Sequence, residues 1–148
     1  MKNRLLRSVI LLTAAALIAA ALLPLFGCVS IAPVDGSYNV FTINRITPDV
    51  YFESLNAEDP SERPSALLTV PEDYDGDPEN IVTLKLKSGG TAEVTVFGKA
   101  KTGTWTAKDD DVLITFEDGE TMAIERLRST AMLLYVLDGV DIILHRAR

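Results

Sequence analysis

The fold is decided by residues 81–98, which read IVTLKLKSGGTAEVTVFG. Apolar residues alternate with Thr and Lys over residues 81–87, which is the period of a β-strand with one buried face. The alternation resumes over residues 91–98, after Ser88-Gly89-Gly90, where glycine supplies the backbone angles of a tight reversal. The stretch therefore predicts a β-hairpin. Its inner face is expected to carry Val82, Leu84, Leu86, Ala92, Val94 and Val96.

Further segments of the same kind lie on both sides of this hairpin. They cover residues 37–46, 101–107, 112–117, 121–127, 131–137 and 140–146, and the fourth strand from the end places Val112, Ile114 and Phe116 inward. Polar turns separate them, among them Asp118-Gly119 and Asp138-Gly139. The chain thus has eight predicted strands, the last seven of them in a meander with steps of about ten residues, which favours an antiparallel sandwich or barrel. In the first strand the alternation slips between Val40 and Phe41, which predicts a β-bulge.

The connection between the first two strands is acidic and rich in proline. Residues 49–79 contain ten acids, one base and four prolines, which is typical of a loop-rich excursion. Thr47-Pro48-Asp49 has the pattern of a helix start, with Thr as cap and Pro at the first helical position, and predicts a short helix over residues 48–56. The last two strands are apolar on both faces, so we expect this helix or a second protein to cover their outer side.

The first 27 residues differ from the rest of the chain. They contain three bases and no acid, and residues 9–23 form an apolar run with the length of a secretory signal segment. The net charge of the chain is −7, so the 121 residues that follow carry −10. That length favours a single domain with a real core, and the negative charge argues against nucleic acid as a partner.

The residues that follow the apolar run are Leu25-Phe26-Gly27-Cys28, which resemble the lipobox of bacterial lipoproteins. Leu25, Gly27 and Cys28 match the pattern, and Phe26 stands where a smaller residue is commoner. The resemblance implies a cleaved signal peptide over residues 1–27 and an acylated Cys28 that begins a tether over residues 28–34. A domain over residues 35–148 would then lie on the extracytoplasmic face of the cell membrane, anchored through lipid, including palmitate.

Two alternatives to this interpretation stay open. The segment up to Cys28 is about as long as a membrane-spanning helix, so it could be an uncleaved signal anchor. Cys28 could instead be a buried core residue, since a free Cys behaves as a small apolar side chain. Both membrane interpretations place the folded part on the extracytoplasmic side of the membrane, because the basic end stays in the cytoplasm.

A second resemblance concerns the domain itself. A first strand that opens Gly36-Ser37-Tyr38, a helical excursion and seven further strands with Gly103-Thr104-Trp105 in their midst resemble the lipocalin-like domains of bacterial lipoproteins. The resemblance implies an all-β fold, an eight-stranded antiparallel up-and-down barrel with one short helix between strands 1 and 2, preceded by the N-terminal signal helix. Lipocalins stack an Arg of the last strand on a Trp of the first. Tyr38 and Arg146 stand in those places and imply a barrel floor.

Residues suited to catalysis or metal binding are few. The single His, His145, has no carboxylate or nucleophile placed beside it by a motif, and one Cys with one His is too few for a zinc site. We therefore expect neither enzymatic activity nor a cofactor. The alternating acids Asp73, Asp75, Asp77 and Glu79 around Gly76 are either a solvated loop or a site for a hard cation such as Ca²⁺.

The sequence thus predicts a lipid-anchored extracytoplasmic binding protein. An eight-stranded barrel is either filled by its own side chains or holds one small ligand, which here would be apolar. The alternative is an envelope interaction module with a filled barrel, which contacts a protein through its last two strands or through residues 49–79. No feature of the sequence identifies that protein.

Overall fold

The structure of the protein, a computed structural model, describes residues 33–127 and 130–147. The predicted signal peptide, with Leu25 and Gly27, and the predicted lipidation site Cys28 lie outside these residues, as does the predicted tether up to residue 32. Within the part of the chain that the structure describes, no helix is long and apolar enough to cross a membrane.

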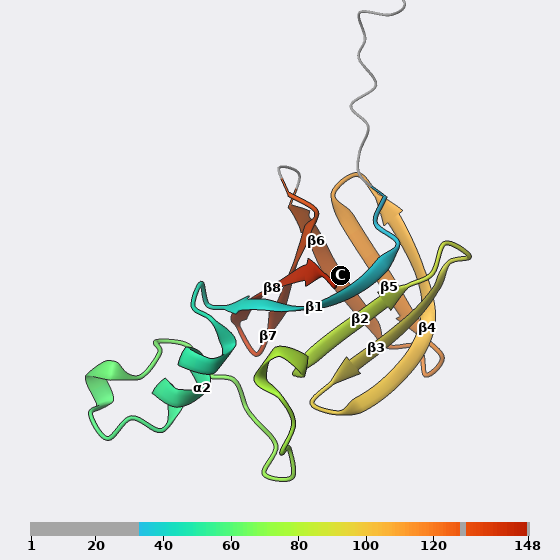
Figure 1. Ribbon diagram of the computed structural model, residues 1–148. Coiled ribbons are helices and arrows are strands. Elements are labelled where there is room, and N and C mark those ends of the chain that lie inside the picture. The colour runs from blue at the N-terminus through green and yellow to red at the C-terminus, as the bar shows by residue number, and fades with distance from the viewer. Residues whose placement is uncertain (1–32, 128–129, 148) are drawn as a thin grey trace, which may run out of the picture. The chain divides into compact units, whose positions relative to one another are not determined.

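Eight antiparallel strands close into an up-and-down barrel in which each strand pairs with its neighbours in sequence and β1 pairs with β8 (Figure 1). This confirms the predicted fold class. The strands are β1 (Gly36–Ile43), β2 (Val82–Leu86), β3 (Thr91–Val96), β4 (Lys99–Lys108), β5 (Asp111–Phe116), β6 (Thr121–Leu127), β7 (Met132–Leu137) and β8 (Val140–Arg146). The connection between β1 and β2 contains helix α2 (Pro48–Leu55) and two short 3-10 helices, η2 (Pro60–Glu62) and η3 (Pro78–Asn80).

The barrel core consists of the alternating side chains that the sequence placed on the inner face. Leu84 pairs with Val94 and Leu86 with Ala92, and all four are at most 2% exposed. Val96 and Phe116, near one end of the barrel, are only partly buried. Burying a Val or Leu side chain fully contributes about 1.5–3 kcal/mol, so these rows stabilise the closed sheet. At the β2–β3 turn only the second glycine, Gly90, has a positive φ, of 83°.

The predicted bulge in β1 is present. Pairing between β1 and β8 shifts register between Val40 and Thr42. Val40 and Ile43 are buried, whereas Phe41, where the alternation slips, is 46% exposed on the outside. Its ring lies 5.5 Å from that of His145.

Helix α2 forms where the sequence placed it, with two differences. Thr47 occupies the cap position and Pro48 the first turn, but the Thr47 side chain makes no capping hydrogen bond. The helix packs mainly against β1 and η3, beside the end of β1 in Figure 1, and Val136 on the outer side of β7 remains 53% exposed. The expectation that the helix covers the outer side of β7 and β8 is therefore wrong, because the helix buries Tyr51 beside the β1–β2 connection instead. The Tyr51 hydroxyl donates to Ala66 O and accepts from Leu68 N, each at 2.9 Å.

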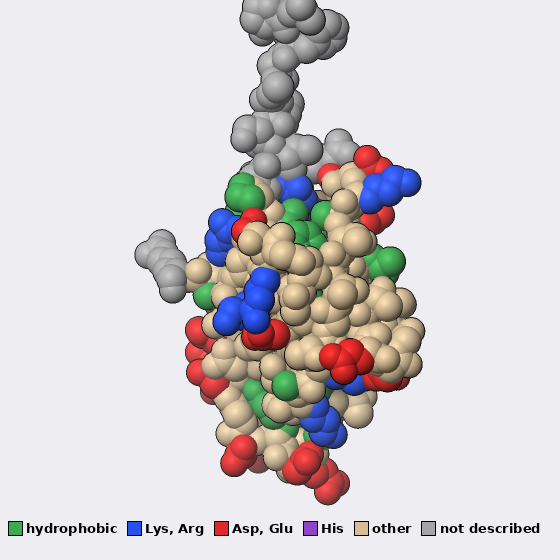
Figure 2. All heavy atoms as spheres, turned by 90° about the vertical axis from the view of Figure 1, so that its right-hand side faces the viewer, with side chains coloured by type: hydrophobic (Ala, Val, Ile, Leu, Met, Phe, Trp, Pro, Cys, Tyr) green, Lys and Arg blue, Asp and Glu red, His purple; other side chains and the backbone are tan. Residues whose placement is uncertain are grey.

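The outer face around β2–β4 is charged and polar. Glu93 on β3 forms ion pairs with Lys85 at 3.9 Å and with Lys87. Figure 2 shows acidic and basic side chains interspersed over this side of the molecule. Such a surface is well suited to solvent, unlike the outer side of β7.

Two strand ladders are shorter than the others. β1 pairs with β2 over three residues, and η3 packs against β1 beyond that point. β6 pairs with β7 only from Glu125↔Leu134 to Leu127↔Met132. Residues Thr121 to Ile124 of β6 therefore have ladder partners on β5 alone.

Candidate functional site

The two ends of the barrel differ in composition. We call the end where the chain enters, near Tyr38 and Arg146, the floor. We call the opposite end, formed by the β3–β4, β5–β6 and β7–β8 turns and the β1–β2 connection, the mouth. Phe97 of the β3–β4 turn packs on Tyr74 of that connection, and Thr69 N donates to Asp138 Oδ2 of the β7–β8 turn at 3.3 Å. These contacts hold the connection at the mouth.

At the floor the structure brings Tyr38 and Arg146 together. They are register partners, and the guanidinium carbon lies 6.0 Å from the centre of the tyrosine ring. The Tyr38 hydroxyl donates to Val34 O at 2.6 Å, and Arg146 donates to Pro33 O at 3.1 Å and to Asp35 O. Burial raises the pKa of Tyr38, although the nearby Arg146 charge opposes the shift. The floor is thus a tie between the entering chain and the last strand.

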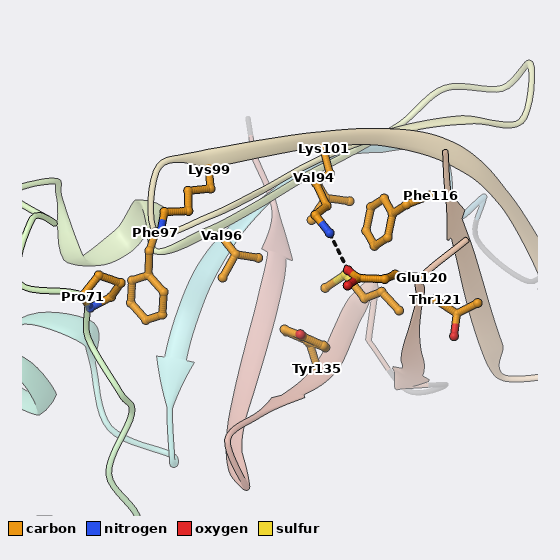
Figure 3. A pocket seen from close by; sticks show the side chains of 11 residues that line it. Pro71, Val94, Val96, Phe97, Lys99, Lys101, Phe116, Glu120, Thr121 and Tyr135 are labelled. Atoms are coloured by element: carbon orange, nitrogen blue, oxygen red, sulfur yellow. Dashed lines mark hydrogen bonds and ion pairs between the residues drawn. The ribbon is translucent and has the colours of Figure 1, made fainter. Parts of the chain in front are cut away.

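The mouth contains a half-open cavity of about 340 Å³ (Figure 3). This volume is at the small end of the range for small-molecule sites. Most of its lining is apolar or aromatic, and the polar groups lie among β4, β6 and β7. The lining residues are Pro71, Val94, Val96, Phe97, Lys99, Lys101, Phe116, Glu120, Thr121, Met122 and Tyr135.

Two lysines of β4 share the inner face with this apolar wall. Lys101 pairs with Val94 and Lys99 with Val96, and paired residues on neighbouring strands project to the same face. Figure 3 shows both lysines on the same side of the cavity as Val94 and Val96 of the neighbouring strand. The sequence analysis missed them, because it started this strand at Lys101 and followed only aliphatic residues. The two-residue turn Phe97-Gly98 is the signal that would have shown Lys99 opposite Val96.

Lys101 is neutralised within the cavity wall. Its ammonium pairs with Asp118 at 2.9 Å and with Glu120, and it lies 5.4 Å from the centre of the Phe116 ring. The hydrogen bonds with Glu120 and Asp118 raise the pKa of Lys101, and the bond from Lys101 lowers the pKa of Asp118. Lys99, by contrast, makes no ion pair within residues 33–127 and 130–147.

The turn that separates these lysines from β3 is held in an unusual conformation. Phe97 has φ 47° and Gly98 has φ 74°, so a bulky side chain occupies the left-handed region. Such a conformation costs about 1–3 kcal/mol and persists only where its surroundings impose it. Phe97 N donates to Ile81 O at 2.8 Å, and the Phe97 ring meets the Tyr74 ring edge-on at 5.4 Å. These contacts fix the Phe97 side of the cavity.

Tyr135 of β7 faces the cavity from the side opposite the lysines (Figure 3). Burial raises the pKa of its hydroxyl, and the charge of Asp138 adds to the shift. The hydroxyl is therefore a neutral hydrogen-bond donor at ordinary pH.

The acidic loop does not assemble a cation site. Asp77 Oδ1 accepts from Glu79 N at 2.9 Å and so caps η3, and the Tyr74 hydroxyl donates to the backbone oxygen of Asp77. Asp73, Asp75, Asp77 and Glu79 are all exposed. Among the residues that the structure describes, no three His, Cys, Asp or Glu side chains are grouped so that they could hold a metal ion.

His145 lies away from the cavity. Its register partner is Asn39, and its neighbours Leu144 and Val40 are buried, so the imidazole is on the outer face against Phe41. The structure therefore places the single His of the chain apart from the acids and hydroxyls of the mouth.

The closed barrel of eight antiparallel strands is compatible with a lipocalin-like fold. A scan against protein-family models matches no family, and searches of curated proteins and of solved structures give no match. The functional argument therefore depends on the mouth cavity and the residues that line it.

Proposed function

We propose that this chain is an extracytoplasmic binding protein, anchored through lipid on Cys28, whose mouth cavity holds a small ligand with an apolar body. The single observation that carries the proposal is the cavity of about 340 Å³ inside the rim of the barrel.

The walls of the cavity suit an apolar guest. Val94 and Met122 are buried parts of the core, and Val96 and Phe116 are partly exposed toward the opening. A ligand that covers them removes apolar surface from water at about 25 cal/mol per Å². Because the walls belong to hydrogen-bonded strands, the cavity exists before a ligand arrives and little ordering is needed on binding.

The test uses a chain that starts at Val29, which contains the whole barrel and its core. We expect an environment-sensitive apolar dye to show a saturable rise in fluorescence, reversed by dodecanol. Val96→Trp, which fills the cavity, should weaken dye binding at least tenfold. Leu113→Trp is the matched control, since Leu113 is 44% exposed on the outer face. No saturable signal, or equal losses in both variants, contradicts the proposal.

A second candidate function rests on the outer side of β7. Val136 is 53% exposed, and a hollow of about 300 Å³ lies where the β6–β7 ladder ends. Its lining residues are Asp111, Ala123, Ile124, Glu125, Leu134 and Val136. Exposed apolar side chains beside two acids fit an envelope protein partner. A photo-crosslinker at Val136 should capture a distinct neighbour in membranes, while the same probe at Thr115 should not. Capture of only a second copy, or of nothing, removes this candidate.

A further inference from the structure

We infer that the ligand of the mouth cavity is an amphiphile with an anionic end, and that this end pairs with the ammonium group of Lys99. The inference rests on the proposed function, because it names the chemical class of ligand for the same cavity. It is carried by a lysine of the cavity lining that has no ion-pair partner among the described residues.

Three charged side chains line the cavity, namely Lys99, Lys101 and Glu120. Glu120 and the nearby Asp118 both pair with Lys101, so that ammonium already has two carboxylate partners. Lys99 has no ion-pair partner among the described residues, although it lies across from Val96 on the inner face. The unpaired positive charge at the cavity is therefore that of Lys99.

The position of Lys99 matches the shape of an amphiphile. Lys99 directly follows the Phe97-Gly98 turn at the rim, whereas Val94 and Met122 lie deeper in the core. A lysine can lay its carbon stem along apolar surface while its charged end stays near water. An apolar tail against Phe116 and Met122 would bring a carboxylate, sulfate or phosphate group to the rim beside Lys99.

Lys101 is less suited to the same role. A ligand anion there would have to compete with Asp118 and Glu120, which hold the ammonium on the Phe116 side of the cavity. Other acids at the mouth include Asp138 of the β7–β8 turn and Glu72 and Asp73 after Pro71, and all three are exposed. At physiological salt the electric field of these carboxylates is screened over about 8 Å. Their repulsion of a ligand anion is therefore weak compared with a direct contact between that anion and the Lys99 ammonium. An amphiphile with a cationic end, attracted by those acids, is the competing outcome.

The experiment compares dodecanoate, dodecanol and dodecylammonium, each below its micellar concentration, by displacement of the same dye from the chain that starts at Val29. We expect dodecanoate to bind about three- to tenfold more tightly than dodecanol, the range for a partly exposed charged contact. Lys99→Met should abolish this ratio by lowering the affinity for dodecanoate to about that for dodecanol. Lys108→Met is the matched control, because it removes the same charge from the far end of β4 and should leave the ratio intact.

The outcomes separate the inference from the proposed function. Equal affinity for dodecanoate and dodecanol, or preference for dodecylammonium, overturns the anionic end while the apolar cavity stands. Loss of the ratio in Lys101→Met but not in Lys99→Met overturns the assignment to Lys99. If none of the three compounds displaces the dye and the dye itself does not bind, the proposed function and the inference both fall.

Discussion

The guanidinium group of Arg146 lies over the ring of Tyr38, and both side chains also bond to the backbone of residues 33–35. The first and last strands are thereby joined to the chain that enters the barrel. Gly36 makes room for this arrangement, since a Cβ there would lie 2.7 Å from Arg146 Nε.

Tyr38→Phe should destabilise the domain by about 1–3 kcal/mol. The substitution keeps the ring under Arg146 but leaves the buried oxygen of Val34 without its donor. Urea unfolding of the chain that starts at Val29 measures the change. Tyr135→Phe is the control, because no hydrogen bond of its hydroxyl to the described residues is present, and its loss should be smaller. Equal losses would mean that the Tyr38 hydroxyl contributes nothing specific.

Gly103→Ala should destabilise the barrel by about 1–3 kcal/mol through overpacking. A Cβ at Gly103 would lie 2.3 Å from Thr115 O on β5, where backbone cannot move away cheaply. Gly89→Ala provides the contrast, because Gly89 has open space around it and no positive φ. Thermal unfolding followed by circular dichroism compares the two. A Gly103→Ala protein as stable as Gly89→Ala would contradict the close approach of β4 and β5.

The early end of the β6–β7 ladder should be visible in hydrogen exchange. Arg126 N donates to Asp110 O, next to β5. Successive amides of a strand point to opposite neighbours, so the Ile124 amide also points toward β5 and the Ala123 amide points toward β7. The β6–β7 ladder stops at Glu125, and the Ala123 amide therefore lies beyond its last pair. We expect Ala123 to exchange faster than Ile124 by at least tenfold in NMR measurements. Similar protection of both amides would show that β7 continues to pair along β6.

Stability should fall in alkaline solution as tyrosines titrate. Burial raises the pKa of Tyr51, although the hydrogen bond from Leu68 opposes the shift. The neutral phenol is therefore favoured in the folded state. Its contribution to the free energy of unfolding is complete below the pKa of the unfolded chain, about 10, and is lost as the pH rises through the higher pKa of the folded state. Tyr51→Phe should show a shallower decline of the free energy of unfolding above pH 10 than the parent protein. Parallel declines would contradict the shift.

The sequence was sufficient for the number of strands and for their aliphatic inner faces because alternation is a local signal, but the first strand ends at Ile43 and not at residue 46. Thr121–Leu127 and Val140–Arg146 begin and end as predicted, and the slip after Val40 marks a true bulge. Alternation cannot say how far two strands stay paired, so the short β6–β7 ladder was not foreseen. The start of the helix at Pro48 could also be predicted from a local sequence signal. The surface on which the helix packs could not, because it depends on where the distant parts of the fold allow Tyr51 to be buried.

Within the candidate site, the sequence identified the apolar walls and missed the charges. Val94, Val96 and Phe116 were expected inward, and all three line the cavity. Lys99 and Lys101 were missed because lysine is ordinarily placed on the solvent side, and only the register across the Phe97-Gly98 turn shows otherwise. The acidic loop has the composition of a cation site, but Asp77 uses a carboxylate oxygen to cap η3.

The tie between Tyr38, Arg146 and residues 33–35 has a geometric consequence for a protein attached at Cys28. Four residues, 29–32, would separate the acylated cysteine from Pro33, so the five Cα–Cα steps reach at most about 18 Å. The anchored molecule would then stand with its floor toward the bilayer and its mouth toward the aqueous compartment. A cargo would be collected from, or handed to, that compartment, because the lipids would lie at the opposite end of the barrel from the cavity.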